Sequence, residues 1–76
     1  MNERRRKRLN RAINLLNQAR DLVDAVRDEE SDAMSNMPEN FQDTERYEKM
    51  ENAVDNLDEA IDNIDEAISQ VESASE

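Results

Sequence analysis

A seven-residue repeat in the second half of the sequence constrains the fold more than any other feature. From residue 53 the chain reads AVDNLDE, AIDNIDE and AISQVES, followed by a truncated ASE. With Val54 at heptad position a, the apolar residues are Tyr47, Val54, Ile61 and Ile68 at a, Met50, Leu57, Ile64 and Val71 at d, and Ala53, Ala60, Ala67 and Ala74 at g. A strict heptad repeat keeps one seam of a helix facing a partner helix. The sequence therefore predicts coiled-coil packing.

The first half of the chain carries a second apolar series with spacings of mostly three and four residues. Its members are Leu9, Ala12, Leu16, Ala19, Val23, Val26 and Ala33. Ile13, Leu15 and Leu22 widen this series on both sides, so the apolar face is broader than one partner helix covers. A hairpin of this size is also marginally stable alone. We therefore expect self-association through Ile13, Leu15 and Leu22, most simply as a dimer of hairpins that forms a four-helix bundle.

One proline separates the two periodic segments. Met37 precedes Pro38 and is disfavoured in the α region, so we expect the first helix over residues 4–36. The connector, residues 37–43, is too short to bring a second helix back parallel to the first. The sequence therefore predicts an all-α fold with a single domain over residues 1–76, an antiparallel helical hairpin.

The second helix is expected over residues 44–73. Asp43 and Thr44 are both suitable N-caps, and Pro38 with Glu39 can begin a single helical turn inside the connector. Antiparallel pairing of the two seams predicts four apolar contacts: Leu9 with Val71, Leu16 with Ile64, Val23 with Leu57, and Val26 with Val54. The two seams then match along the whole hairpin.

The net charge of -10 is distributed unevenly. Residues 1–27 hold eight basic and three acidic residues, a net charge of +5, whereas residues 28–76 hold two basic and seventeen acidic residues, a net charge of -15. The halves therefore attract each other, and the hairpin brings the basic run Arg4–Arg8 beside Glu72 and Glu76. Because the acidic half repels nucleic acid, a nucleic-acid partner for the basic run is less favoured than pairing with these acids.

The composition excludes several kinds of site. Histidine, cysteine and glycine are absent, so the chain offers no thiolate or imidazole metal ligand, no disulfide and no pair of nucleophile and histidine. A calcium-binding loop needs glycine at its turn and a spacing that is not helical. We therefore predict that the protein is not an enzyme and has no catalytic, cofactor-binding or metal-binding residue. No apolar run is long enough to span a membrane, and a cytoplasmic protein without a membrane partner is expected.

The second helix carries the main candidate for a binding site. Six carboxylates point away from its seam at positions b, e and f, and we call them the acidic ladder: Asp55, Asp58, Glu59, Asp62, Asp65 and Glu66. Because they share one side of this helix without neighbouring bases, they are expected to bind a basic surface on a protein partner. The simpler interpretation is a solvated face that keeps a small helical protein in solution, and runs of charge most often have this role.

The tip of the hairpin is the alternative partner-binding site. It gathers both aromatic residues and three methionines: Met34, Met37, Phe41, Tyr47 and Met50. These side chains either close the end of the bundle or form an adaptable contact surface. Closure is the favoured interpretation, because monomeric proteins rarely expose apolar patches.

The connector also carries a resemblance. Residues 36–42 read N-x-P-E-x-x-Q, between a basic start and an acidic heptad tail. In this motif, and loosely over residues 1–72, the chain resembles small uncharacterised helical proteins encoded in bacteriophages and prophages, chiefly of Gram-positive hosts. The resemblance implies a phage-associated accessory protein in the host cytoplasm. Such small acidic proteins are often inhibitors of host defence systems or adaptors of phage machinery.

These observations together predict a non-enzymatic module that occupies a surface of a larger protein. The preferred function is a phage-encoded inhibitor of a bacterial defence protein. The alternatives are a structural or scaffolding coiled-coil subunit and a nucleic-acid-binding protein led by its basic N-terminus. The three differ in behaviour: an inhibitor binds one target protein, a structural subunit forms larger assemblies as its concentration rises, and binding to nucleic acid weakens steeply with salt.

Overall fold

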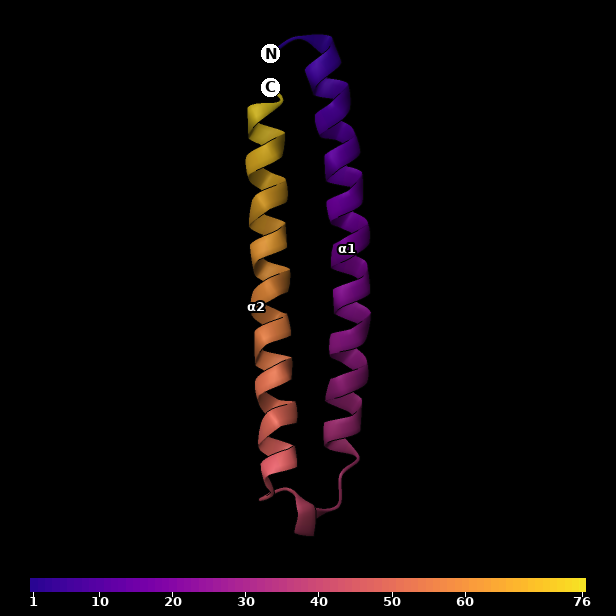
Figure 1. Ribbon diagram of the computed structural model, residues 1–76, viewed down its shortest axis with the longest axis vertical. Coiled ribbons are helices and arrows are strands. Elements are labelled where there is room, and N and C mark those ends of the chain that lie inside the picture. The colour runs from indigo at the N-terminus through magenta and orange to yellow at the C-terminus, as the bar shows by residue number, and fades with distance from the viewer.

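The computed structural model describes residues 1–76 and consists of two long helices in one antiparallel hairpin (Figure 1). Helix α1 spans Glu3–Ser35, and helix α2 spans Glu45–Ala74. A 3₁₀ turn, η1 (Glu39–Phe41), lies between them. The predicted all-α hairpin is confirmed, and each predicted helix boundary differs from the observed one by a single residue.

Side-chain caps fix where each helix begins. The Asn2 side chain accepts a hydrogen bond from the Arg5 backbone N–H at 2.9 Å. Thr44 Oγ1 accepts one from the Tyr47 backbone N–H at 3.3 Å, so Thr44 and not Asp43 is the N-cap of α2. Each cap satisfies a backbone donor that the first turn of a helix leaves without a partner.

The connector reverses the chain without glycine. Pro38 has extended backbone angles, φ -57° and ψ 147°, and precedes η1, the single helical turn that the sequence predicts. Asn36 ends α1 in the right-handed region, and no residue of the chain has a positive φ. Thr44 Oγ1 also donates to the Phe41 carbonyl at 2.6 Å, which ties η1 to the start of α2. The turn therefore uses only backbone angles that most residues adopt freely.

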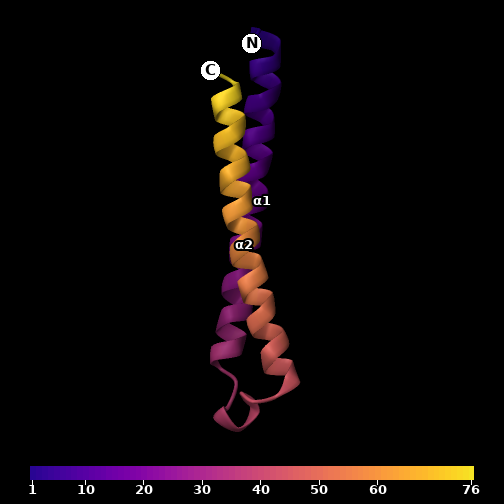
Figure 2. The ribbon, with the colours of Figure 1, turned by 90° about the vertical axis from the view of Figure 1, so that its left-hand side faces the viewer.

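The hairpin is long and thin. Its Cα extents are 59 × 14 × 12 Å, and the two helices cross along their length (Figure 2). Two helices bury little surface, and Ile61, at 6% exposed, is the only fully buried residue. The other seam residues of α2 are partly buried: Tyr47, Met50, Val54, Leu57, Ile64, Ile68 and Val71. The seam of α2 therefore agrees with the heptad prediction.

The contact face of α1 is rotated from the predicted one. Leu9, Leu16 and Val23 are partly buried as expected. In contrast, three residues predicted in the seam face solvent, and this part of the prediction is wrong: Ala19, Val26 and Ala33. In their place the seam contains Ile13, Arg20 and Arg27, which are partly buried. The rotation follows from the two arginines, because their apolar stems lie along the seam while their guanidinium groups reach carboxylates of α2.

Both chain ends lie at the same end of the hairpin (Figure 1). Arg6 Nε donates to the Ser75 carbonyl at 3.0 Å, so the basic run Arg4–Arg8 does lie beside the end of α2. The run makes no ion pair with Glu72 or Glu76. The positive charge of Arg6 meets the last carbonyl groups of α2 instead, which form the negative end of the helix dipole.

Candidate functional site

Two flanks run along the hairpin on either side of the seam. In a heptad, positions e and g border the a/d seam on opposite sides. Position e of α2 meets the two arginines of α1, and this charged flank comprises Arg20, Asp24, Arg27, Asp28, Asp58 and Asp65. The opposite, uncharged flank comprises the g alanines Ala53, Ala60 and Ala67 of α2 together with Ala12, Leu15, Ala19, Leu22, Val26 and Ala33 of α1. On the charged flank the side chains form ion pairs within the hairpin, whereas on the uncharged flank large apolar side chains stay exposed.

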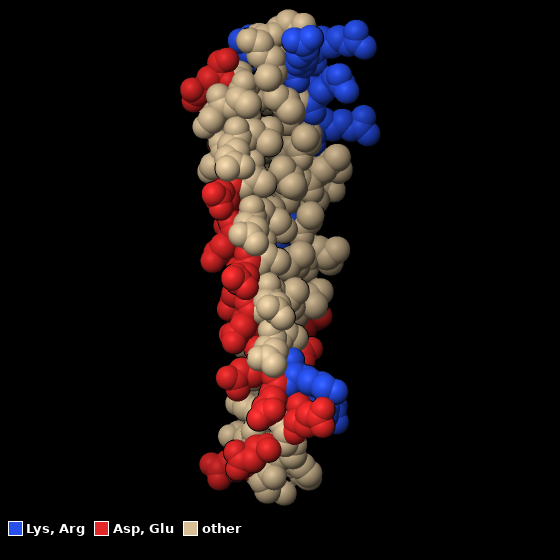
Figure 3. Space-filling view, turned by 60° about the vertical axis from the view of Figure 1, so that its left-hand side comes forward, with Lys and Arg blue, Asp and Glu red and all other residues tan.

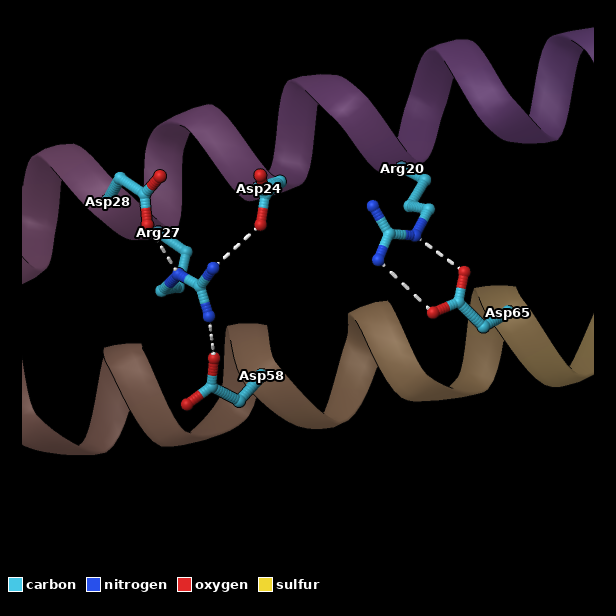
Figure 4. A network of polar contacts seen from close by, with 6 residues as sticks. All are labelled: Arg20, Asp24, Arg27, Asp28, Asp58 and Asp65. Carbon is cyan, nitrogen blue, oxygen red and sulfur yellow. Dashed lines mark hydrogen bonds and ion pairs between the residues drawn. The ribbon is translucent and has the colours of Figure 1, made fainter.

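Arg20 forms a two-point ion pair across the seam (Figure 4). Its Nε donates to Asp65 Oδ1 at 2.5 Å, and its Nη2 donates to Asp65 Oδ2 at 3.2 Å. This fork geometry is the one in which a guanidinium and a carboxylate bind most strongly. The hydrogen bond to Asp65, and then the charge of Asp65, raise the pKa of Arg20 above its ordinary value.

Arg27 binds three carboxylates, from both helices (Figure 4). Its Nη1 donates to Asp58 Oδ1 on α2, its Nη2 donates to Asp24 Oδ1 at 2.6 Å, and its Nε donates to Asp28 Oδ1 at 2.9 Å. The hydrogen bonds to Asp58 and Asp28 raise the pKa of Arg27. With its side chain 27% exposed, Arg27 is the centre of the charged flank.

The sequence contains a signal for these pairs that its interpretation missed. Arg20 and Arg27 lie one heptad apart, as do Asp58 and Asp65. In an antiparallel hairpin the later residue of one pair meets the earlier residue of the other, which is the observed pairing. The prediction that no base neighbours the acidic ladder is therefore wrong at Asp58 and Asp65.

Four residues of the acidic ladder remain available to a partner. They are exposed and make no ion pair within the hairpin: Asp55, Glu59, Asp62 and Glu66. Spacings of four, three and four residues keep them on one side of α2 over about 16 Å. Figure 3 shows acidic side chains along this edge of the molecule. Carboxylates without neighbouring bases maintain a negative potential there.

The hairpin tip is only partly closed. Met34, Met37, Tyr47 and Met50 are partly buried, whereas Phe41 is 50% exposed. An open hollow of about 420 Å³ is lined by Ala33, Met37, Pro38, Phe41, Thr44, Arg46 and Met50. The predicted tip residues therefore lie together, but they leave an apolar concavity that full closure of the bundle end would have removed.

A second hollow lies at the opposite end of the hairpin. It has a volume of about 400 Å³ and is lined by Met1, Arg5, Arg8, Leu9 and Ala12. Unlike the hollow at the tip, it has two guanidinium groups in its wall. The two ends of the hairpin therefore offer concavities of similar size, with one arginine in the wall at the tip and two at the opposite end.

The uncharged flank leaves large apolar side chains open to solvent. Leu15 is 55% exposed, Leu22 is 67% exposed and Val26 is 43% exposed. Ile13, the third residue predicted for self-association, is partly buried. Figure 3 shows a broad band without charge that runs along the molecule beside the acidic edge. Within this band, Leu15, Leu22 and Val26 stay exposed because the hairpin itself does not cover them.

No protein-family model, curated protein or solved structure matches this chain. Neither helix combines the length and the apolar character of a membrane-spanning segment. No group of three or more acidic residues is arranged to hold a metal ion. The resemblance of the connector to phage proteins stays a prediction, and the function is argued from the surfaces of the hairpin.

Proposed function

We propose that this chain is a non-enzymatic protein-interaction module that occupies a basic surface of a larger protein. The observation that carries this function is the row of four exposed carboxylates without an ion pair, Asp55, Glu59, Asp62 and Glu66. Asp58 and Asp65 have a different role, because Arg27 and Arg20 already neutralise them. The free carboxylates form a narrow row that a complementary row of lysine and arginine residues matches.

The physics of such a surface favours recognition through charge. Ordered carboxylates on a rigid helix attract a basic partner from a distance and raise its association rate more than they raise its affinity. Binding should therefore be fastest at low ionic strength and weaken as salt screens the attraction. Contact through the apolar tip would depend little on salt.

In the specific form of this function, the partner is a bacterial defence protein and the chain is its phage-encoded inhibitor. The support is the resemblance of the N-x-P-E-x-x-Q connector to phage and prophage proteins. A helix bearing regularly spaced negative charge is a suitable inhibitor of a protein with a basic groove, since it blocks the groove without any chemistry.

Two variants distinguish the ladder from the tip. In the ladder variant, Asp55→Lys, Glu59→Lys, Asp62→Lys and Glu66→Lys reverse the free carboxylates. In the tip variant, Met37→Asp and Phe41→Ser change the hollow. A tagged parent chain is used to purify its partner from bacterial lysate, the partner is identified by mass spectrometry, and its affinity for all three proteins is then measured.

The ladder variant should lose binding and the tip variant should retain it, with both still helical by circular dichroism. The opposite result would show that the tip makes the contact and that the four carboxylates serve only hydration. A partner that binds all three proteins equally would also rule out this function.

A further inference from the structure

Four exposed residues of α1 form a line that passes through the uncharged flank and ends in a charged residue on either side. Arg8, Leu15, Leu22 and Glu29 follow one another at intervals of seven residues, so they share one heptad position and one side of the helix. All four face solvent. Neither Arg8 nor Glu29 makes an ion pair within the hairpin. The line therefore has two apolar residues at its centre and one free charge of each sign at its ends.

This line is complementary to itself when one copy is reversed. Two antiparallel copies place Leu15 against Leu22 of the other, and Arg8 against Glu29 of the other. Two parallel copies place each charge against the same charge, which is unfavourable. An interface with two-fold symmetry requires this property, because residue i must fit residue j while residue j fits residue i.

We propose that the uncharged flank binds a second copy of this chain, antiparallel, about a two-fold axis at the centre of the hairpin. Ala19 is the central residue of α1, and Ala60 lies at the centre of α2. An axis through this level packs α1 against α1 and α2 against α2. The alanines of the flank, with their short side chains, allow the helices to approach closely, and Leu15 and Leu22 fill the space between them.

The two ends of the hairpin support the same orientation. The end that carries both termini, residues 1–11 and 66–76, holds six basic and four acidic residues, whereas residues 28–51, around the tip, hold nine acidic and two basic residues. In the antiparallel pair each basic end covers the acidic tip of the other copy. The hollow that contains Arg5 and Arg8 then lies near the hollow of the tip, whose wall contains Arg46, so the attraction comes from the acidic residues around the tip and not from the hollow itself. A parallel pair would bring like ends together.

The area of the flank is sufficient for a stable dimer. With Cα extents of 59 × 14 × 12 Å, one long face covers on the order of 800 Å², the area that each partner contributes to an interface of standard size. The single hairpin fully buries Ile61 alone, so it gains much from covering Leu15, Leu22 and Val26. The inference is independent of the proposed function, because positions b and f of the acidic ladder point away from this flank.

Engineered disulfides test the arrangement, since the chain has no cysteine of its own. In the antiparallel pair, position 19 lies at the axis, whereas the two copies of position 33 are separated by about 42 Å. Air oxidation of Ala19→Cys should give a covalent dimer, and Ala33→Cys, the matched control, should stay monomeric on a non-reducing gel. Cross-linking of both variants would mean a parallel pair, and cross-linking of neither would mean that this flank does not bind a second copy. Either result would overturn the proposal.

Charge reversal provides a second test that introduces no thiol. Arg8→Glu and Glu29→Arg should each weaken the dimer about tenfold by sedimentation equilibrium, because each creates two repulsive contacts in the symmetric pair. The double variant restores both attractions and should return to within about twofold of the parent. If the single variants associate as tightly as the parent, the antiparallel arrangement is wrong.

Discussion

The charged flank and the uncharged flank border the same seam, but the hairpin itself pairs or covers their side chains to different degrees. On the charged flank, Arg20 and Arg27 satisfy four carboxylates within one chain. On the uncharged flank, Leu15 and Leu22 are more than half exposed. The difference teaches that the chain satisfies its own charged groups on one side and leaves apolar side chains exposed on the other, where the proposed dimer would cover them.

The two flanks also differ in physical character. Ion pairs need specific geometry and are individually weak at a surface, so the charged flank fixes the register of the two helices more than it stabilises them. Burial of apolar surface is not directional and scales with area, so the uncharged flank contributes stability only when a partner covers it. Stability should therefore depend on protein concentration through one flank and on salt through the other.

The largest effect is expected between the flanks, at the one fully buried residue. Ile61→Ala removes the centre of the seam and should lower the free energy of unfolding by about 2–4 kcal/mol in urea titrations. Ile13→Ala, at a partly buried position of the same seam, should cost clearly less. Equal losses of unfolding free energy at the two positions would show that Ile61 contributes no more to stability than Ile13 does.

Leu22→Asp tests the uncharged flank. Two copies of Leu22 lose their contacts in each dimer, so the dissociation constant should rise about a hundredfold or more. The thermal midpoint of the parent should rise with protein concentration, whereas that of the variant should not. Asn14→Asp is the matched control, because it adds the same charge at an exposed position away from the flank. If the parent is monomeric and fully helical at micromolar concentration, the uncharged flank does not bind a second copy.

Arg27→Gln tests the charged flank. It removes hydrogen bonds to three carboxylates, so it should lower the thermal midpoint by about 2–6 °C, and Arg20→Gln should lower it less. The loss should be the same at all protein concentrations and should shrink in 0.5 M salt. A loss that instead disappears on dilution would place Arg27 in the association surface.

The smallest effect concerns pH. The pKa values of Arg20 and Arg27 are raised in the folded chain. A raised pKa gives stability that is present below the pKa of the unfolded chain and is lost only as pH rises through the folded value. Arginine is charged at pH 7 and remains so in strongly alkaline solution even in an unfolded chain, and the raised pKa extends this range further. The difference in unfolding free energy between parent and Arg27→Gln should therefore be equal at pH 7 and pH 11, and a smaller difference at pH 11 would contradict this assignment.

Much of the hairpin follows from local sequence signals. The heptads of α2 predict its seam, Pro38 predicts the end of α1, and Thr44 is one of the two predicted caps. These features depend on residues within a few positions of one another. The exposed carboxylates at positions b and f of α2 and the exposed Leu15 and Leu22 were likewise predictable, because a heptad assigns each residue to a side of its helix.

The rotation of α1 was not predictable from a division into apolar and polar residues. Two series, offset by one residue, compete for the contact with α2, and one of them contains Arg20 and Arg27. A binary pattern assigns arginine to solvent, so it selects Ala19 and Val26 for the seam. The choice depends on the register of the opposite helix, which brings Asp65 within reach of Arg20. Charge pairing between distant heptads carries this information, and apolar periodicity does not.

Both chain ends lie at one pole of the hairpin and the tip lies at the other (Figure 1), so the length of the helices separates them. Two continuous helices hold the apolar hollow of the tip apart from anything joined to either end, across most of the 59 Å length. In an antiparallel pair, one tip faces each pole. Such a rod would present two equivalent rows of free carboxylates, and capture of a second basic surface would benefit from the high local concentration that the first capture creates.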